Sequence, residues 1–226
     1  LAEGLFKAGI ATFRYDKRTF VDPGSMPTNA TVDDEVTHDV LNIIHYFNNN
    51  DTFRNYKLYI IGHSLGALMA PRIAQEAKGE VAGIVMMAGP ATPLIDLTLK
   101  QVTYLDSLFP SEQQHEALKE IKQQVHYMHR PAFNENSPAD SLLFNQKASY
   151  WLSYSNYKPL QIIKKLSTPF LILQGEKDYQ VSMTDFNLWK KATKGRSNMS
   201  FKSYPGLSHL FMQSEGTPSP KDYESA

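Results

Sequence analysis

The sequence predicts an α/β fold built on a mostly parallel sheet with helices on both faces, and three observations lead to this prediction. Short apolar runs alternate with amphipathic segments in the first and last parts of the chain, as in βαβ units. The run VAGIVMMAG at 81–89 is apolar on both faces, as a buried parallel strand is. A serine flanked by glycines, in GHSLG at 62–66, follows an apolar and β-branched run.

The composition is that of an ordinary globular chain. It has 226 residues, of which 42% are hydrophobic, and Lys plus Arg balance Asp plus Glu at 23 each. This balance gives no reason to expect nucleic acid or an anionic membrane surface as a partner, so we expect a small molecule. The absence of cysteine excludes disulfides, thiolate metal ligands and a cysteine nucleophile.

Location and assembly are less accessible from the sequence. No apolar run reaches the roughly 18 residues that span a bilayer. No targeting signal is visible, so a cytoplasmic location is the default expectation, although the chain opens inside an apparent helix without a methionine. The sequence does not indicate an oligomeric state.

The first part of the chain predicts a helix, a strand and a second helix. Residues 1–6 carry an apolar helical face, and Gly9 can end that helix before IATFRY at 10–15, which is typical of a strand. Thr31 and Asp34 resemble a capping box with Asp in place of Glu or Gln. The helix that follows has one apolar stripe, made of Val32, Val36, Val40, Ile43, Ile44 and Phe47.

The next elements are a strand at 58–62, a helix from about 65 to 77 and the strand at 81–89. Pro71 cannot donate a helical hydrogen bond and should kink the helix. From 92 to 166 no strand-like run occurs, and Ser111 with Gln114 forms a second capping box. The alternation resumes with strands at 169–174 and 199–204 around a helix at 183–193. We therefore predict a core at 1–91 and 167–226, with a helical cap inserted at 92–166.

Ser64 has the setting of a nucleophile. In a nucleophile elbow the strand turns so tightly into a helix that flanking side chains would collide, which explains Gly62 and Gly66. The turn presents the serine hydroxyl at the carboxyl edge of the sheet. The backbone N–H of Leu65 can then donate to a developing oxyanion.

A serine nucleophile needs a base, and seven histidines compete for that role. His209 follows the last predicted strand, at the edge where α/β folds present functional residues. His63 is expected to pack away from the elbow. The remaining ones are expected on helix surfaces or in the insertion: His38, His45, His115, His126 and His129. The last two have i, i+3 spacing, but no carboxylate at a matching position indicates a metal site.

The carboxylate that orients the base should follow another strand. The segment GEKD offers Glu176 and Asp178, of which Asp178 is preferred. Asp16 is a third choice, with a local turn or ion-pair role expected for it and its neighbours Lys17 and Arg18. The chain order Ser64, Asp178, His209 is that of one hydrolase fold.

These motifs resemble the α/β-hydrolase superfamily, and within it the bacterial carboxylesterase-like members with a helical cap between strands six and seven. The motifs are FRYDKR after strand four, GHSLG at the elbow, GEKD after strand seven and GLSH after strand eight. The resemblance implies that Ser64 is the nucleophile, His209 the general base and acid, and Asp178 the orienting carboxylate. It also implies an oxyanion donor at Leu65 N–H and no cofactor or metal.

The resemblance also suggests that the sequence is an excerpt. Such hydrolases take a second oxyanion donor from a loop after strand three, and no residue of this sequence can be assigned to it. Strand three also lies between strands four and five, so these residues alone would leave a gap in the sheet. We expect the N-terminal strands and the final helix to be missing from this excerpt.

The expected activity is hydrolysis of carboxylic esters with small to medium uncharged acyl or aromatic groups, through an acyl-enzyme intermediate. In similar hydrolases the stretch before strand seven walls the acyl pocket, which makes Trp151 and Tyr154 candidates, with packing of the cap as the alternative. Val181 can face the site or the core. The rival functions are a thioesterase, a peptidase related to prolyl oligopeptidases, and a non-catalytic receptor on the same fold.

Overall fold

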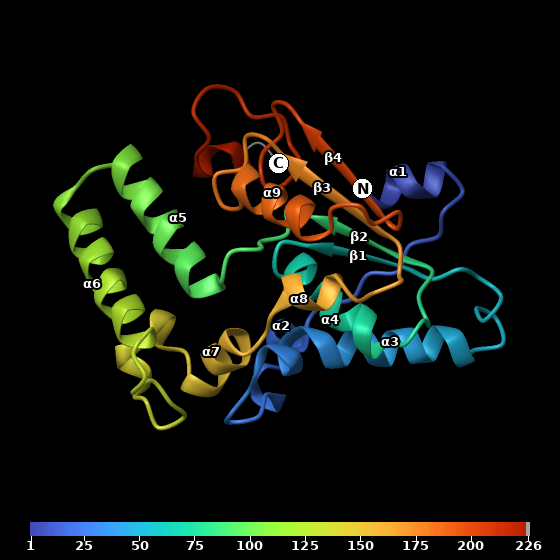
Figure 1. Ribbon diagram of the computed structural model, residues 1–226, viewed down its shortest axis with the longest axis horizontal. Helices are drawn as coiled ribbons and strands as arrows, with labels where there is room; N and C mark the ends of the chain where they lie inside the picture. Colours follow the sequence, from blue (N-terminus) through green and yellow to red (C-terminus); the bar gives the residue numbers. More distant parts are fainter. Residues whose placement is uncertain (225–226) are drawn as a thin grey trace.

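A four-stranded parallel sheet forms the centre of the protein (Figure 1). The computed structural model describes residues 1–224. Its strands lie in the spatial order β1 (Tyr59–His63), β2 (Gly83–Met87), β3 (Phe170–Gly175) and β4 (Met199–Tyr204). All four agree with runs that the sequence analysis assigned to strands, and each neighbouring pair is parallel.

The helices include three that join consecutive strands or lie beside them: α4 (Leu65–Glu76), α8 (Pro159–Ile163) and α9 (Met183–Ala192). The N-terminal part contributes α1 (Ala2–Lys7), α2 (Arg18–Val21), the 3₁₀ turn η1 (Pro23–Ser25), the π-helical turn η2 (Asp33–Thr37) and α3 (His38–Asn49). Between β2 and α8 lie α5 (Leu94–Leu108), α6 (Glu112–Met128), η3 (Ala139–Ser141), η4 (Leu143–Asn145) and α7 (Ala148–Ser155), and η5 (Pro220–Tyr223) follows β4.

The helices that pack directly on the sheet cover one face of it. Helix α4 packs on β1 and β2, and α9 packs on β3, where Phe186 contacts Phe201 of β4 edge to face. Phe201 pairs in register with Ile172, which belongs to the buried face of the sheet. On the opposite face Tyr59 and Ile61 are exposed. Within residues 1–224 the helices with the main contacts to the sheet, α4 and α9, thus lie on its buried face. The strand order never reverses, so right-handed crossovers put their helices on the same side.

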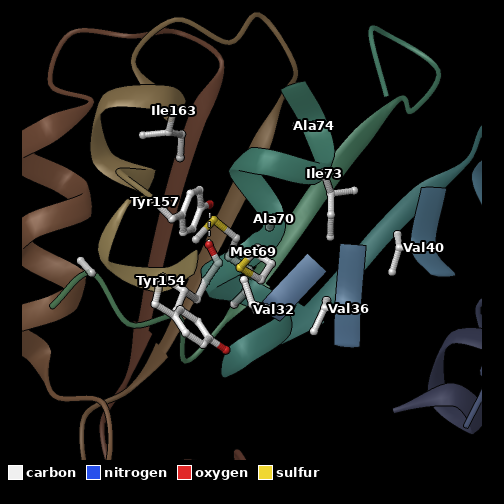
Figure 2. Packing of buried hydrophobic residues seen from close by; sticks show 14 of the residues in the cluster. Val32, Val36, Val40, Met69, Ala70, Ile73, Ala74, Tyr154, Tyr157 and Ile163 are labelled. Carbon is white, nitrogen blue, oxygen red and sulfur yellow. Dashed lines mark hydrogen bonds between the residues drawn. The ribbon is translucent and has the colours of Figure 1, made fainter. Parts of the chain in front are cut away.

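The main core lies between that covered face and the helices around it. Figure 2 shows Met69, Ala70, Ile73 and Ala74 of α4 packed beside a stripe of valines from η2 and α3. The predicted stripe is confirmed at Val32, Val36, Val40 and Ile44, which are all buried. Tyr157 and Ile163 close the cluster from the segment before β3, and the Tyr157 hydroxyl donates to the Leu68 carbonyl at 2.8 Å.

One local prediction is corrected. Residues 10–16 form no strand and are exposed, because no neighbouring strand lies beside them in the part of the chain that the structure describes. Helix α4 contains Pro71, which is buried, and the kink expected there stays a prediction. Ser111 caps α6 as predicted, since its side chain accepts from the Gln114 N–H. The Thr31–Asp34 box is confirmed in half: Asp34 accepts from the backbone N–H and the hydroxyl of Thr31, and no bond from the Asp34 N–H to Thr31 is present within residues 1–224.

The region between β2 and β3 contains helices and no strand. Helices α5 and α6 pack on each other as a hairpin that projects to the left of the sheet in Figure 1. Helix α8, near the end of this region, packs instead on α4 and α9. The hairpin is thus the part of this region that stands furthest from the sheet.

Candidate active site

The carboxyl ends of the four strands meet at one edge of the sheet, because all strands are parallel. Ser64 follows β1 directly, Asp178 lies three residues after β3, and His209 lies five residues after β4. The arrowheads in Figure 1 point to this edge, from which the chain also leaves β2 toward α5. The topology therefore brings three segments that are distant in sequence to the same edge.

Ser64 has the backbone of a sharp strand-to-helix turn. Its φ is 53° and its ψ is −111°, a strained combination for a residue with a side chain. Its N–H donates to the Met87 carbonyl at 2.9 Å, which holds the turn against β2. Leu65 is the first residue of α4, so its N–H has no intrahelical acceptor.

The two glycines of the elbow are not equivalent. A Cβ on Gly62 would lie 2.5 Å from the Gly66 carbonyl oxygen, so any side chain at 62 would push the turn open. A Cβ on Gly66 would meet no atom within 4 Å among residues 1–224. The prediction that both glycines avoid collisions is therefore correct for Gly62 and wrong for Gly66.

Asp178 and His209 form a buried hydrogen-bonded pair. His209 Nδ1 lies 2.8 Å from Asp178 Oδ2, and the two side chains are 5% and 0% exposed. The second carboxylate oxygen, Oδ1, accepts from the backbone N–H groups of Gln180 and Val181, each at 2.9 Å. These donors fix the plane of the carboxylate and leave Oδ2 directed at the imidazole.

Gln174 completes the surroundings of Asp178. This glutamine of β3 is buried, and its Nε2 donates to Asp178 Oδ2 at 3.0 Å and to the Val181 carbonyl at 2.8 Å. Gln174 was not among the site residues predicted from the sequence. A polar residue inside an otherwise apolar strand was the available signal, since a buried amide needs hydrogen-bond partners.

The loop that carries His209 packs closely on the end of β3. A Cβ on Gly175 would lie 2.3 Å from the Leu207 carbonyl oxygen and 2.5 Å from that of Ser208, so only glycine allows this approach. The Leu207 carbonyl also accepts from the N–H of Lys177 at 3.0 Å. The loop closes on itself where the Ser208 N–H donates to the Met212 carbonyl at 2.8 Å.

His63 links this loop to the nucleophile elbow. Its Nε2 lies 2.8 Å from the carbonyl oxygen of His209, and the two imidazole rings are 4.6 Å apart. The expectation that His63 packs away from the site is therefore wrong. Partial burial is the largest influence on His63 and lowers its pKa, and the His209 ring lowers it further against the opposing hydrogen bond.

The Ser64 hydroxyl and His209 are not hydrogen-bonded to each other within residues 1–224. Catalytic hydrogen bonds are often long or poorly aligned before substrate binds, and they tighten in the productive complex. The described geometry thus contains the His–Asp pair and the strained serine at one edge of the sheet, without a hydrogen bond between them.

The other candidate acids lie elsewhere. Glu176 is exposed and accepts from the Ser203 hydroxyl at 2.7 Å, and Asp16 is exposed in the irregular N-terminal segment. Lys17 pairs with Glu35 at 2.9 Å, and Arg18 pairs with Asp39, so the expected ion-pair roles are confirmed for these two residues, with partners 18 and 21 residues along the chain. Of the acids weighed from the sequence, only Asp178 contacts the imidazole of His209.

Two of the three histidines of the helical region pair with carboxylates of α5. His129 Nε2 lies 2.7 Å from Asp96, and His115 Nδ1 lies 2.6 Å from Asp106. Among residues 1–224 no group of three or more His, Asp or Glu side chains could hold a metal ion. The same residues contain no helix that is both long and apolar enough to cross a membrane.

The three candidate substrate residues are buried. Trp151 is 2% exposed and its Nε1 donates to the Leu143 carbonyl, and Tyr154 is 7% exposed with its hydroxyl 3.3 Å from that of Tyr150. Val181 is 1% exposed. The packing alternative therefore fits Trp151 and Tyr154, and Val181 serves the site through its backbone.

Two surface cavities lie apart from these residues. A cavity of about 520 Å³ lies on the α5–α6 hairpin and includes Asp106, His115 and Lys122 in its lining. Another of about 450 Å³ lies beside Arg18 and Asp39. Neither is lined by the His–Asp pair, so the site is identified by its chemistry and not by a hollow.

Comparison with known proteins gives consistent matches. A family model described as serine aminopeptidase, S33, matches residues 1–215. Esterase EstD of Thermotoga maritima is 33% identical over 223 residues, which are 99% of this chain and 51% of the relative. The chain therefore spans about half the length of this relative.

Solved structures share the fold. Est1E from Butyrivibrio proteoclasticus has a TM-score of 0.60 at 17% identity, over 93% of this chain and 72% of that one. The esterase domain of a Rhodothermus marinus protein has a TM-score of 0.54 at 16% identity, over 93% and 70%. At these identities the likeness concerns the fold alone.

Proposed function

The chain belongs to the serine aminopeptidase S33 family of α/β hydrolases, and on that premise we propose that it hydrolyses carboxylic esters with Ser64, His209 and Asp178. The observation that carries the proposal is the buried hydrogen bond between His209 Nδ1 and Asp178 Oδ2 at the edge where Ser64 has a strained backbone. The 33% identical relative is named an esterase, which supports an ester as the bond that is hydrolysed.

The hydrogen bonds of Asp178 define the protonation of the base. A carboxylate only accepts, so the proton of the neutral imidazole must lie on Nδ1, where it is donated to Oδ2. His209 Nε2 then keeps a lone pair that can take the proton of the Ser64 hydroxyl. Asp178 also stabilises the imidazolium that this transfer produces.

The reaction then proceeds in two steps. Ser64 Oγ attacks the ester carbonyl, and the resulting oxyanion accepts from the N–H of Leu65. His209 passes its proton to the leaving alcohol, which departs and leaves an acyl-enzyme. Water, deprotonated by His209, attacks the acyl-enzyme, and His209 returns the proton to Ser64 Oγ as the acid is released.

The preferred substrates are small to medium esters with uncharged acyl or aromatic groups. We also assign the helical region 92–166 to the cap that governs this preference. Its support is connectivity, because α5 begins shortly after β2 ends at the edge of the sheet that carries Ser64.

A second candidate function is peptide or amide hydrolysis, which the description of the matching family favours. The two activities use the same residues and differ in the leaving group. Nitrophenyl esters of graded chain length, aminoacyl nitroanilides and acyl-CoA compounds should be compared by kcat/KM. Preference for the short nitrophenyl esters supports the esterase, and preference for a nitroanilide or a thioester replaces it.

A further inference from the structure

We infer that His63 is a positioning residue that fastens the His209 loop to the nucleophile elbow. The inference deepens the proposed function and rests on it, since it concerns how the general base is held. It is carried by the contact between His63 Nε2 and the His209 carbonyl at 2.8 Å, which joins residues 146 positions apart.

The location of His63 gives this contact its effect. His63 is the last residue of β1, directly before Ser64, so it moves with the elbow. The His209 loop is held toward β3 by the close approach at Gly175 and by the hydrogen bond from Lys177 N–H to Leu207. The His63 contact adds a hold from the β1 side. Together these contacts limit the direction in which the imidazole can move relative to the serine.

The hydrogen bond to the His209 carbonyl determines which ring nitrogen of His63 carries a proton. A carbonyl oxygen only accepts, so His63 must carry a proton on Nε2. The titratable groups near its ring are His209 and Asp178, and the net effect of the surroundings, with burial the largest, lowers the pKa of His63. His63 is therefore neutral at neutral pH and protonated on Nε2. A neutral neighbour suits a base that must become positively charged during the reaction, because a cation beside it would oppose that charge.

His63 is not an alternative base. Its Nε2 is committed to the His209 carbonyl, and the structure provides the orienting carboxylate to His209 and not to His63. Its effect should therefore be on the rate of the chemical step through geometry. A displacement of about 1 Å at such a site can cost on the order of 10²-fold in rate.

The test compares two substitutions. H63F keeps an aromatic ring and removes the donor, and H63Q replaces the imidazole with an amide donor. With p-nitrophenyl butyrate, H63F should lower kcat by at least about tenfold with KM within about threefold, and H63Q should keep kcat within about threefold of the wild type. A wild-type kcat in H63F, or an equal loss in H63Q and H63F, would overturn the inference.

A measurement on the wild-type protein removes any dependence on folding of the variants. Long-range ¹H–¹⁵N spectra of the histidine rings, with His63 assigned by its loss in H63Q, should give the Nε2-protonated form near neutral pH. An Nδ1-protonated His63 would refute the contact. S64A separates the two proposals, because retained ester hydrolysis in S64A defeats the proposed function whatever His63 does.

Discussion

Replacing Asp178 with asparagine should invert the hydrogen-bond pattern at the base while changing the volume very little. Oδ1 faces two backbone N–H groups, from Gln180 and Val181, so the amide oxygen must remain there. The new NH₂ group must then occupy the Oδ2 position, where it faces His209 Nδ1 and the donor Nε2 of Gln174. Gln174 cannot turn to accept without giving up its bond to the Val181 carbonyl.

The consequence is a wrong tautomer of His209. With a donor at the Oδ2 position, Nδ1 must accept, so the imidazole proton lies on Nε2. A protonated Nε2 has no lone pair with which to take the proton of the Ser64 hydroxyl. The wrong tautomer costs a serine triad about 10⁴-fold in kcat, which corresponds to about 5 kcal/mol in the activation barrier. The donor-to-donor contact with Gln174 should also cost about 1–3 kcal/mol of folding stability.

The assay is kcat with a nitrophenyl ester, alongside circular dichroism and thermal melting to establish that D178N is folded. The matched control is E176Q, since Glu176 lies two residues away, is exposed and accepts through its side chain from the Ser203 hydroxyl at the surface. E176Q should retain kcat within about threefold, as surface changes usually have small effects. A folded D178N within tenfold of the wild type, or an equal loss in E176Q, would refute the assignment of the acid.

Three further predictions concern the nucleophile elbow, the buried carboxylate of Asp185 and the pKa of His63. G62A should disrupt the elbow and abolish labelling of Ser64 by a fluorophosphonate, because its Cβ would lie 2.5 Å from the Gly66 carbonyl oxygen. G66A should be labelled at a rate near that of the wild type. Faster labelling of G62A than of G66A would contradict the difference between the two glycines. The buried Asp185 Oδ1 accepts from Ala91 N–H and Thr92 N–H. D185A should therefore lower the free energy of unfolding, measured with urea, by about 1–3 kcal/mol for each N–H left without an acceptor. An unchanged free energy of unfolding would count against these hydrogen bonds. Because the pKa of His63 is lowered in the folded protein, the unfolded chain binds a proton at this residue more readily. The free energy of unfolding of the wild type should therefore fall as the pH drops below about 6.5. H63Q should lose less of its free energy of unfolding between about pH 7 and about pH 5, and equal losses in the two proteins would contradict the pKa shift.

The parts of the fold that local patterns determine were accessible from the sequence. The four strands, the valine stripe and the Ser111 cap each depend on residues close together in the chain. Ser64, Asp178 and His209 could be proposed because each follows an apolar run, and parallel strands bring such positions to one edge. The family resemblance inferred from these motifs agrees with the family match over residues 1–215.

The features that the sequence did not provide depend on partners distant in the chain. IATFRY has strand-like residues, but a strand also needs a neighbour to pair with, and local composition cannot supply one. The face of the sheet on which the connecting helices pack is determined by the spatial order of the strands, and the sequence pattern does not give that order. His63 has its role only because a loop 146 residues away presents a carbonyl to it.

Fluorophosphonate labelling of the intact protein, with the modified residue located by mass spectrometry, tests the central claim most directly. The account predicts a single covalent adduct at Ser64 that is absent in S64A and forms far more slowly in H209A. Absence of an adduct at Ser64 in the folded wild-type protein, or labelling of H209A at the wild-type rate, would contradict it.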